Sequence, residues 1–185
     1  MLINKFNIAK ISTDLFDLFF PETCLNCGNL QEIRGKYLCF FCLSEVPLTN
    51  FSFQWENELE NSFKGRIPLH AATSLMYFEK NGMVQKLIHE LKYNNKPEIG
   101  TFLGKWLAEE IRLSKRFEMI DLVVPVPLHP DKQKKRGYNQ VHDFAHSLAE
   151  GLNARLGLHL LRKIRNNQSQ TSKNRQQRVV TEEDQ

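Results

Sequence analysis

The stretch that decides the fold is DLVVPVPLHPDKQKKRGYNQ, residues 121–140. It opens with an apolar run, DLVVPV, which is typical of a strand buried on both faces of a parallel sheet. A basic segment follows, with the side chains Lys132, Lys134, Lys135 and Arg136. Gly137 permits a turn, and a helix is expected to begin near Asn139. Such a strand, loop and helix predict an anion site, because helix amino termini and the carboxyl ends of strands favour bound anions.

The flanking segments have the pattern of an alternating α/β domain. Apolar residues at helical spacing predict a helix over about residues 82–94 and a second helix that starts after Pro97. The third predicted helix has as its apolar positions Val141, Ala145, Leu148, Leu152 and Leu156. Two further strands are expected, ATSLMYF at 72–78 and LHLL at 158–161. This order of strands and helices favours a parallel sheet with crossover connections.

All four cysteines lie near the amino terminus, as the pairs Cys24-x2-Cys27 and Cys39-x2-Cys42 with eleven residues between them. This is the four-thiolate spacing of a zinc ribbon, in which two tight turns aim four sulfurs at one tetrahedral ion. Gly28 suits the left-handed backbone of such a turn. Two disulfides or a redox-active Cys-x-x-Cys pair are the alternatives, but no strand precedes either pair as a thioredoxin-like site requires. Four thiolates leave no open position, so the predicted zinc is structural.

Composition and charge limit the remaining classes of protein. The 25 basic and 21 acidic residues give a net charge of +4, too mild to predict a nucleic-acid-binding protein by itself. No segment has the pattern of a membrane span or a signal peptide, and paired cysteines that bind metal fit a cytoplasmic protein. Three units are predicted: a helix over 5–20 with the zinc ribbon in 1–48, a linker over 49–68, and an α/β domain over 69–185.

Four segments resemble, in order and spacing, the competence protein F family (ComF, GntX-like). They are CLNCG from Cys24, YLCFFC from Tyr37, LIHELKYNNKPEIGTFLGKWLAEEI from Leu87, and VVPVPLHPDKQKKRGYNQVHDFAHSLAEGL from Val123. Members of this family look like type I phosphoribosyltransferases that carry an amino-terminal zinc ribbon. The resemblance therefore implies a zinc ribbon followed by a partial phosphoribosyltransferase-like parallel sheet flanked by helices. It covers the chain from Cys24 to about Arg178.

The resemblance also implies a binding site for phosphoribosyl diphosphate (PRPP), together with Mg²⁺ in the complete family fold. Arg136 would hold the diphosphate through a bidentate fork. Near the strand, the candidate residues are Lys92, Val126, Pro127, Leu128, Lys135, Arg136, Gly137, Asn139 and Gln140. A basic tail resembles the mobile segment that closes over the substrate, and its candidate residues are Arg165, Gln170, Thr171, Arg175 and Arg178. Without the resemblance, the basic run reads as a solvated surface, and Lys92 as a cation that interacts with a helix dipole.

One element of type I phosphoribosyltransferases is missing from the sequence. They bind PRPP mainly through two adjacent acidic residues and a Thr- and Gly-rich turn after a late strand, whereas the last glycine here is Gly157. The chain therefore looks truncated before this loop, and we expect weakened PRPP affinity. We also expect an apolar sheet edge that makes the protein marginally stable or self-associating.

The sequence leaves the function open between three classes. The first is a ComF-like protein that binds PRPP and takes part in DNA uptake during natural transformation; no acid or base for a transferase reaction is visible. The second is an accessory protein that binds single-stranded DNA through phosphate contacts, alone or with the uptake machinery. The third is an inactive fragment whose ribbon contacts a partner. His142 and His146, four residues apart, form no convincing metal motif, since no acidic residue completes it.

Overall fold

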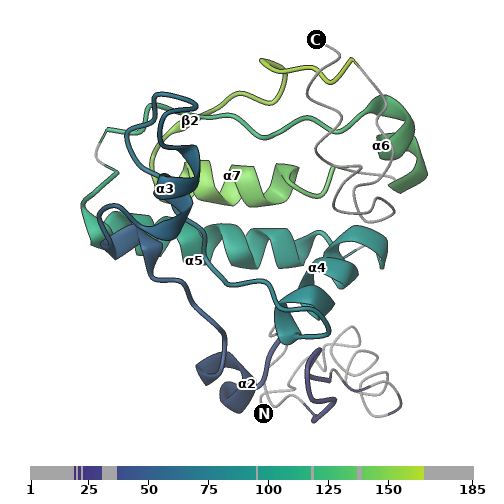
Figure 1. Cartoon of the computed structure of the whole chain (residues 1–185). Coiled ribbons are helices and arrows are strands. Elements are labelled where there is room, and N and C mark those ends of the chain that lie inside the picture. The colour runs from purple at the N-terminus through teal and green to yellow at the C-terminus, as the bar shows by residue number, and fades with distance from the viewer. Residues whose placement is uncertain are drawn as a thin grey trace, which may run out of the picture.

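The computed structural model describes Phe19, Pro21 and residues 23–30, 37–94, 96–117, 119–136 and 139–164, with backbone alone at Lys135 and Arg136. Its elements are α2 (Phe40–Ser44), η1 (Phe51–Phe53), α3 (Glu58–Phe63), α4 (Met83–Tyr93), α5 (Glu98–Ser114), β1 (Leu122–Val123), α6 (Pro130–Arg136), α7 (His142–Gly151) and β2 (Arg155–Leu156) (Figure 1). The helix predicted over 5–20 lies outside the described residues except at Phe19. Among the described residues, no helix is both long and apolar enough to cross a membrane.

The three longest helices confirm the sequence pattern. α4 and α5 occupy the two predicted positions, and α7 begins three residues after Asn139. α7 ends at Gly151, so Leu156 lies beyond it, in β2. α5 and α7 lie side by side and make the most extensive contact between elements of the structure (Figure 1). Their packing forms the centre of the α/β part.

Small residues bring α5 and α7 close together. Gly104 of α5 faces the backbone of α7, where an added Cβ would lie 2.4 Å from the Phe144 carbonyl oxygen. Gly151 of α7 faces Ala108 of α5, and an added Cβ there would lie 2.6 Å from the Ala108 Cβ. Both distances are shorter than van der Waals contact. Glycine is therefore required at these positions by the close approach of two helices, although it weakens each helix slightly.

We expect Gly104→Ala to destabilise the protein by about 2 kcal/mol, because the new methyl group forces two packed helices apart. Gly100→Ala is the matched control: it lies on the same helix, gains the same helix propensity, and its Cβ would stay 3.3 Å or more from its neighbours. Its effect should stay within about 1 kcal/mol of zero. Urea unfolding followed by circular dichroism measures both. Equal stabilities for the two variants would contradict the close packing at Gly104.

The sheet is a parallel pair of short strands. β1 pairs with β2 in the register Leu122 with Arg155 and Val123 with Leu156. The predicted parallel pairing is thus confirmed, but the prediction of a long strand buried on both faces is wrong, since Leu122 is 40% and Val126 75% exposed. Pro125 and Pro127 have no N–H group and cannot extend the ladder. Among the described residues, no further helix or strand covers Leu122 and Val126.

Both other predicted strands are wrong. LHLL at 158–161 forms a turn and an irregular segment, and the strand instead comes earlier, at Arg155–Leu156. The left-handed backbone of Asn153 (φ 54°) turns the chain directly after α7, so Arg155 reaches β1 first. In ATSLMYF, only Met76 forms a bridge, with Leu48. Among the apolar residues that stay exposed near the sheet are Met119, Leu122, Val126, Leu160, Leu161 and Ile164. Self-association through such residues stays a prediction.

The basic segment is helical and not the loop that the sequence suggests. α6 spans Pro130–Arg136, with proline at its first position and Asp131 in its first turn. Both favour a helix start, and the lysines, glutamine and arginine that follow are good helix formers. The Asp131 N–H donates to His129 Nδ1 at 3.3 Å, which satisfies one of the free backbone donors at the start of the helix. The connection between β1 and α6 is therefore limited to residues 124–129.

Residues 49–68, predicted as a linker, contain η1 and α3 and several buried residues. Asn57 caps α3 through a bond from the Glu60 N–H to its Oδ1, and its Nδ2 donates to the carbonyls of Phe51, Gln54 and Ala72. Arg116, which follows α5, donates to the carbonyls of Phe51 and Gln54 and pairs with Glu60. Hydrogen bonds therefore join residues 49–68 both to Ala72, which follows them in the chain, and to Arg116, which follows α5. The division into three units stays a prediction.

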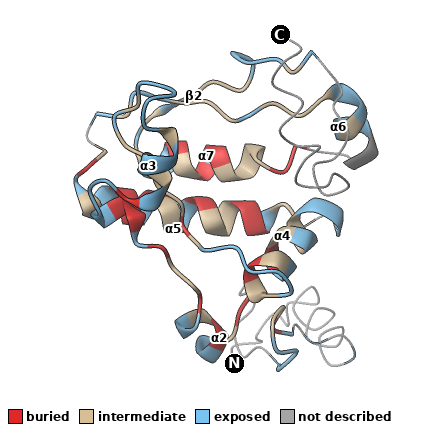
Figure 2. Cartoon of the chain, viewed as in Figure 1, coloured by how far each residue is buried: buried red, intermediate tan, exposed pale blue. Residues whose placement is uncertain are grey.

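Buried residues lie along α5 and α7, and also where α4 and α5 meet the segment with the cysteines (Figure 2). One core cluster unites Leu87 of α4 and Ile99 of α5 with Cys24, Leu38, Cys42 and Val46. Leu87 and Ile99 are almost completely buried, at 1% and 0% exposure. The cysteine-containing segment thus shares a hydrophobic core with the first two long helices.

Candidate functional site

The first cysteine pair lies in a tight turn. An antiparallel bridge joins Thr23 to Leu30, and the Cys24 N–H donates to the Asn29 carbonyl at 2.8 Å. Within this turn the Gly28 N–H donates to the Cys24 carbonyl at 2.9 Å, with φ 76° at Gly28. The predicted left-handed glycine is confirmed. We call residues 23–30 and 37–46 together the cysteine module.

The second cysteine pair lies at the start of α2. Cys39 is the N-cap residue, and its Sγ accepts a hydrogen bond from the Cys42 N–H at 3.5 Å. The Cys39 N–H in turn donates to Cys24 Sγ at 3.3 Å. A helix start therefore directs backbone donors at the sulfurs, an arrangement that favours thiolates.

The two turns bring all four sulfurs into one cluster. The Sγ atoms of Cys24, Cys27, Cys39 and Cys42 lie within 4.8 Å of one another. Cys27 Sγ and Cys39 Sγ are 3.7 Å apart, close to the ~3.8 Å that two sulfurs have when each is about 2.3 Å from a tetrahedral zinc. All four cysteines are free, which excludes the alternative of two disulfides in this structure. The donor set is compatible with a structural zinc that has no open coordination position.

The pKa values of the clustered cysteines fit a site for a cation. Burial acts to raise the pKa of Cys24, but hydrogen bonds from the backbone of Cys27 and Cys39 outweigh it and lower this pKa to about 6. At Cys42 the hydrogen bond from Asn26 acts to lower the pKa, yet burial and the neighbouring sulfurs raise it to about 12. The sulfurs thus hinder one another's ionisation, and a bound divalent cation would remove that penalty.

The segments proposed for anion binding meet at the start of α7. A Cβ added at Gly100 of α5 would lie 3.3 Å from the Phe144 nitrogen, 3.4 Å from the Gln140 carbonyl and 3.6 Å from Leu91 Cδ1. Leu91 belongs to the LKY motif and Gln140 to the RGYNQ motif. Two motifs that lie almost fifty residues apart in the sequence are therefore brought together around one glycine.

The individual residues of this candidate anion site differ in their exposure. Asn139 and Gln140 are both 5% exposed, and Asn139 Oδ1 accepts a hydrogen bond from the Val141 N–H at 3.3 Å. Lys92 is exposed in the last turn of α4. Val126 is exposed, while Pro127 and Leu128 are half-buried before α6. The structure thus places two buried amides at the helix start and an exposed cation, Lys92, at the end of α4.

Several predicted residues lie outside the described residues. These are Gly137, Arg165, Gln170, Thr171, Arg175 and Arg178, together with the side chains of Lys135 and Arg136. Their roles stay predictions. Sequence reasoning missed Asn26, which donates to Cys42 Sγ at 3.3 Å, and Lys86, which donates to Asn26. The place of Asn26 between Cys24 and Cys27 could have indicated its role, whereas Lys86 carries no such signal.

These features define a small protein of helices and a parallel strand pair with a four-cysteine centre. The chain is 32% identical over 69 residues to the DNA utilization protein YhgH of Salmonella typhimurium, a match that covers 36% of this chain and 30% of that protein. It is 24% identical over 144 residues to competence protein F of Haemophilus influenzae, covering 72% of this chain and 62% of that protein. The chain thus spans less than two thirds of either relative. No family model and no solved structure matches it.

Proposed function

We propose that this chain is a competence protein F-like protein that takes part in DNA uptake, and that the segment after β1 binds the diphosphate group of PRPP or a related phosphorylated molecule. The similarity to competence protein F and to a DNA utilization protein supports the first part. The second part is supported by the meeting of the LKY and RGYNQ motifs at Gly100. The proposal includes binding and no reaction.

The order of the strands and helices supports the binding of an anion at the amino terminus of α7. Because β1 and β2 are parallel and α7 leads from the end of one to the start of the other, the amino terminus of α7 lies toward the carboxyl ends of the strands. That edge is where open α/β sheets bind ligands. α6 adds Lys132 and Lys134 next to it, half-buried and exposed respectively. Backbone donors, buried amides and nearby cations together suit a diphosphate.

Isothermal calorimetry with magnesium pyrophosphate and with magnesium PRPP tests the anion site. We expect weak binding of both, because the diphosphate is the part that this segment would hold. A variant in which Lys132, Lys134, Lys135 and Arg136 are replaced by glutamine should lose at least tenfold in affinity for pyrophosphate, since each lost cation removes a charge-assisted contact. The matched control replaces Lys64, Lys80, Lys105 and Lys115, which are exposed and lie on other segments.

Two results would contradict the anion site. One is no heat with either ligand at millimolar concentration, and the other is an equal loss of affinity in the two fourfold variants. The second result would show that binding follows net charge alone. Circular dichroism of both variants checks that α4, α5 and α7 remain folded.

A second candidate function is binding of single-stranded DNA. Phe40 and Phe41 of α2 are 79% and 76% exposed, and their ring centroids are 6.1 Å apart in an edge-on arrangement. Exposed aromatic rings are typical of proteins that stack on unpaired bases. Fluorescence anisotropy with an oligothymidine across a salt series tests this function. An affinity that is unmoved by salt and by Phe40→Ala with Phe41→Ala would reject it.

A further inference from the structure

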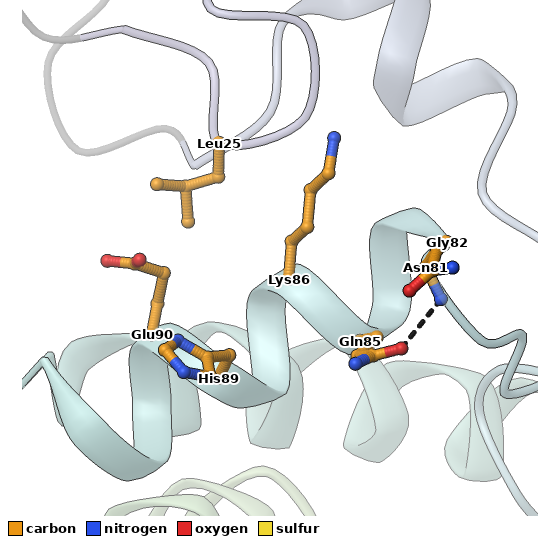
Figure 3. A pocket seen from close by; sticks show the side chains of 7 residues that line it. All are labelled: Leu25, Asn81, Gly82, Gln85, Lys86, His89 and Glu90. Atoms are coloured by element: carbon orange, nitrogen blue, oxygen red, sulfur yellow. Dashed lines mark hydrogen bonds between the residues drawn. The ribbon is translucent and has the colours of Figure 1, made fainter.

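Asn26 connects the four-cysteine cluster to α4. Its Nδ2 donates to Cys42 Sγ at 3.3 Å, while its backbone carbonyl and its Oδ1 accept from Lys86 Nζ at 2.8 and 3.1 Å. Figure 3 shows Lys86 rising from α4 toward the segment that carries Leu25. A hydrogen-bonded chain therefore runs from a cation on α4, through one amide, to a sulfur of the cluster.

The chemistry of the three groups determines the orientation of the amide. A lysine ammonium only donates hydrogen bonds, so the oxygen of the Asn26 side chain must face Lys86. The nitrogen of the same amide must then face Cys42, where it donates to the sulfur. Lys86 thus orients a donor toward a metal ligand, in addition to adding a positive charge near it.

This orientation matters because of the charge of the loaded centre. Four thiolates around one Zn²⁺ carry a net charge of −2, which nearby donors and cations stabilise. We propose that Lys86 and Asn26 are positioning residues of the metal centre, which stabilise its negative charge and hold the cysteine module against α4. The inference rests on metal binding by the four cysteines and is independent of the anion site.

The neighbouring acidic residue on α4, Glu90, is paired with other groups, so the charge of Lys86 can act on the four-cysteine cluster. Glu90, one turn further along α4, is bound by Lys96 at 2.9 Å and by Asn94 at 2.7 Å. Gln85 accepts from the Asn81 N–H at 2.6 Å and so holds the start of α4 (Figure 3). Lys86 itself lies beside a cavity of about 460 Å³ that Leu25 and His89 also line. Water and salt reach this cation, so its effect should weaken at high ionic strength.

Zinc transfer from the loaded protein to a chromophoric chelator tests the inference. We expect Lys86→Gln to release zinc about tenfold faster than the wild type, the lower end of what partners of metal ligands contribute. Lys86→Arg retains the charge and a donor and should stay near the wild-type rate. Lys80→Gln, which removes an exposed lysine shortly before α4, should have no effect. The difference between Lys86→Gln and the wild type should shrink as salt is added.

Cobalt substitution separates a role at the metal from simple packing. Loss of a hydrogen bond to a thiolate makes the sulfur a better electron donor. We therefore expect Asn26→Ala to move the sulfur-to-cobalt charge-transfer band to longer wavelength, and Lys86→Gln to move it less. Identical spectra and identical zinc release in the wild type and both variants would overturn the inference. So would a wild-type protein that binds no zinc, measured first by mass spectrometry under native conditions.

Discussion

Replacing Cys42 with serine is expected to abolish zinc binding and unfold the cysteine module, while α4, α5 and α7 remain folded. Cys42 is only 5% exposed and belongs to the core cluster with Cys24, Leu38 and Val46. The module contains one five-residue helix and a single bridge, too little structure to be stable alone. Structural zinc contributes an apparent ~10–16 kcal/mol in comparable small sites. The loss of one ligand should therefore remove most of the free energy that keeps the cysteine module folded.

Hydrogen exchange followed by mass spectrometry measures this result on the zinc-loaded protein. Peptides from 37–46 should lose protection in Cys42→Ser, whereas peptides from α5 and α7 should keep it. Ser44→Ala is the control, because Ser44 lies in the same helix and its hydroxyl group donates to the Phe41 carbonyl at 2.8 Å. Retention of one zinc ion and of full protection in Cys42→Ser would refute a metal-dependent fold of the module.

Acidification should have the same effect as the substitution. Zinc binds thiolates, so protons compete with it and the metal is released as the pH falls. A chelator at neutral pH removes the metal without protonating carboxylates. Agreement of the exchange patterns in acid and in chelator would assign the acid-induced change to the metal centre.

The helices and the four-cysteine cluster could be predicted because their signals are local. The spacing of Cys24, Cys27, Cys39 and Cys42 is enough to bring four sulfurs together, and the period of apolar residues is enough to place α4 and α5. Strands depend on neighbours that are distant in the sequence. The apolar run at 121–126 predicts a buried strand, but the part of the chain that the structure describes supplies one partner strand, and two prolines limit the pairing to two residues.

The candidate site shows the same division between local and distant information. The motifs LKY and RGYNQ can be recognised in the sequence, whereas their meeting at Gly100 depends on how α5 packs against α7. The bonds of Lys86 to Asn26 join residues sixty positions apart and follow no periodic pattern. Arg116 is a further example, since a lone arginine after a helix reads as an exposed cation and instead lies buried against segment 49–72.

Arg116→Met is expected to destabilise the protein by about 3 kcal/mol or more, because it removes the cation that pairs with Glu60 in a buried place and one of the two donors at each of the Phe51 and Gln54 carbonyls. The Arg116 side chain is 4% exposed, and its Nη2 lies 2.6 Å from Glu60 Oε1. Its guanidinium also stacks 4.4 Å from the centre of the Trp55 ring. Arg116→Lys should not restore stability, since a lysine cannot bridge Glu60 and the carbonyls of Phe51 and Gln54 together.

Arg112→Ala is the matched control for Arg116. Arg112 pairs with Glu109 at 2.6 Å, but both side chains are more than half exposed, and such pairs contribute about 0–1 kcal/mol. Urea unfolding of both variants measures the difference. Equal losses of stability would show that burial of Arg116 adds nothing to an ordinary surface pair.

The pH dependence of stability identifies the carboxylate that Arg116 holds. Burial acts to raise the pKa of Glu60, but the Ala72 N–H and Arg116 outweigh it and hold this pKa below its usual value of 4.5. A lowered folded-state pKa stabilises the protein above the unfolded-state value, and this contribution disappears as the pH falls through the folded-state value. The stability gap between the wild type and Glu60→Gln should therefore be full at neutral pH and shrink below about pH 4.5. In the Arg116→Met background, Glu60→Gln should cost little at any pH, since the cation that favours the charged carboxylate is gone. A gap that persists unchanged in that background would mean that the Ala72 N–H alone, and not Arg116, holds Glu60 in its charged form.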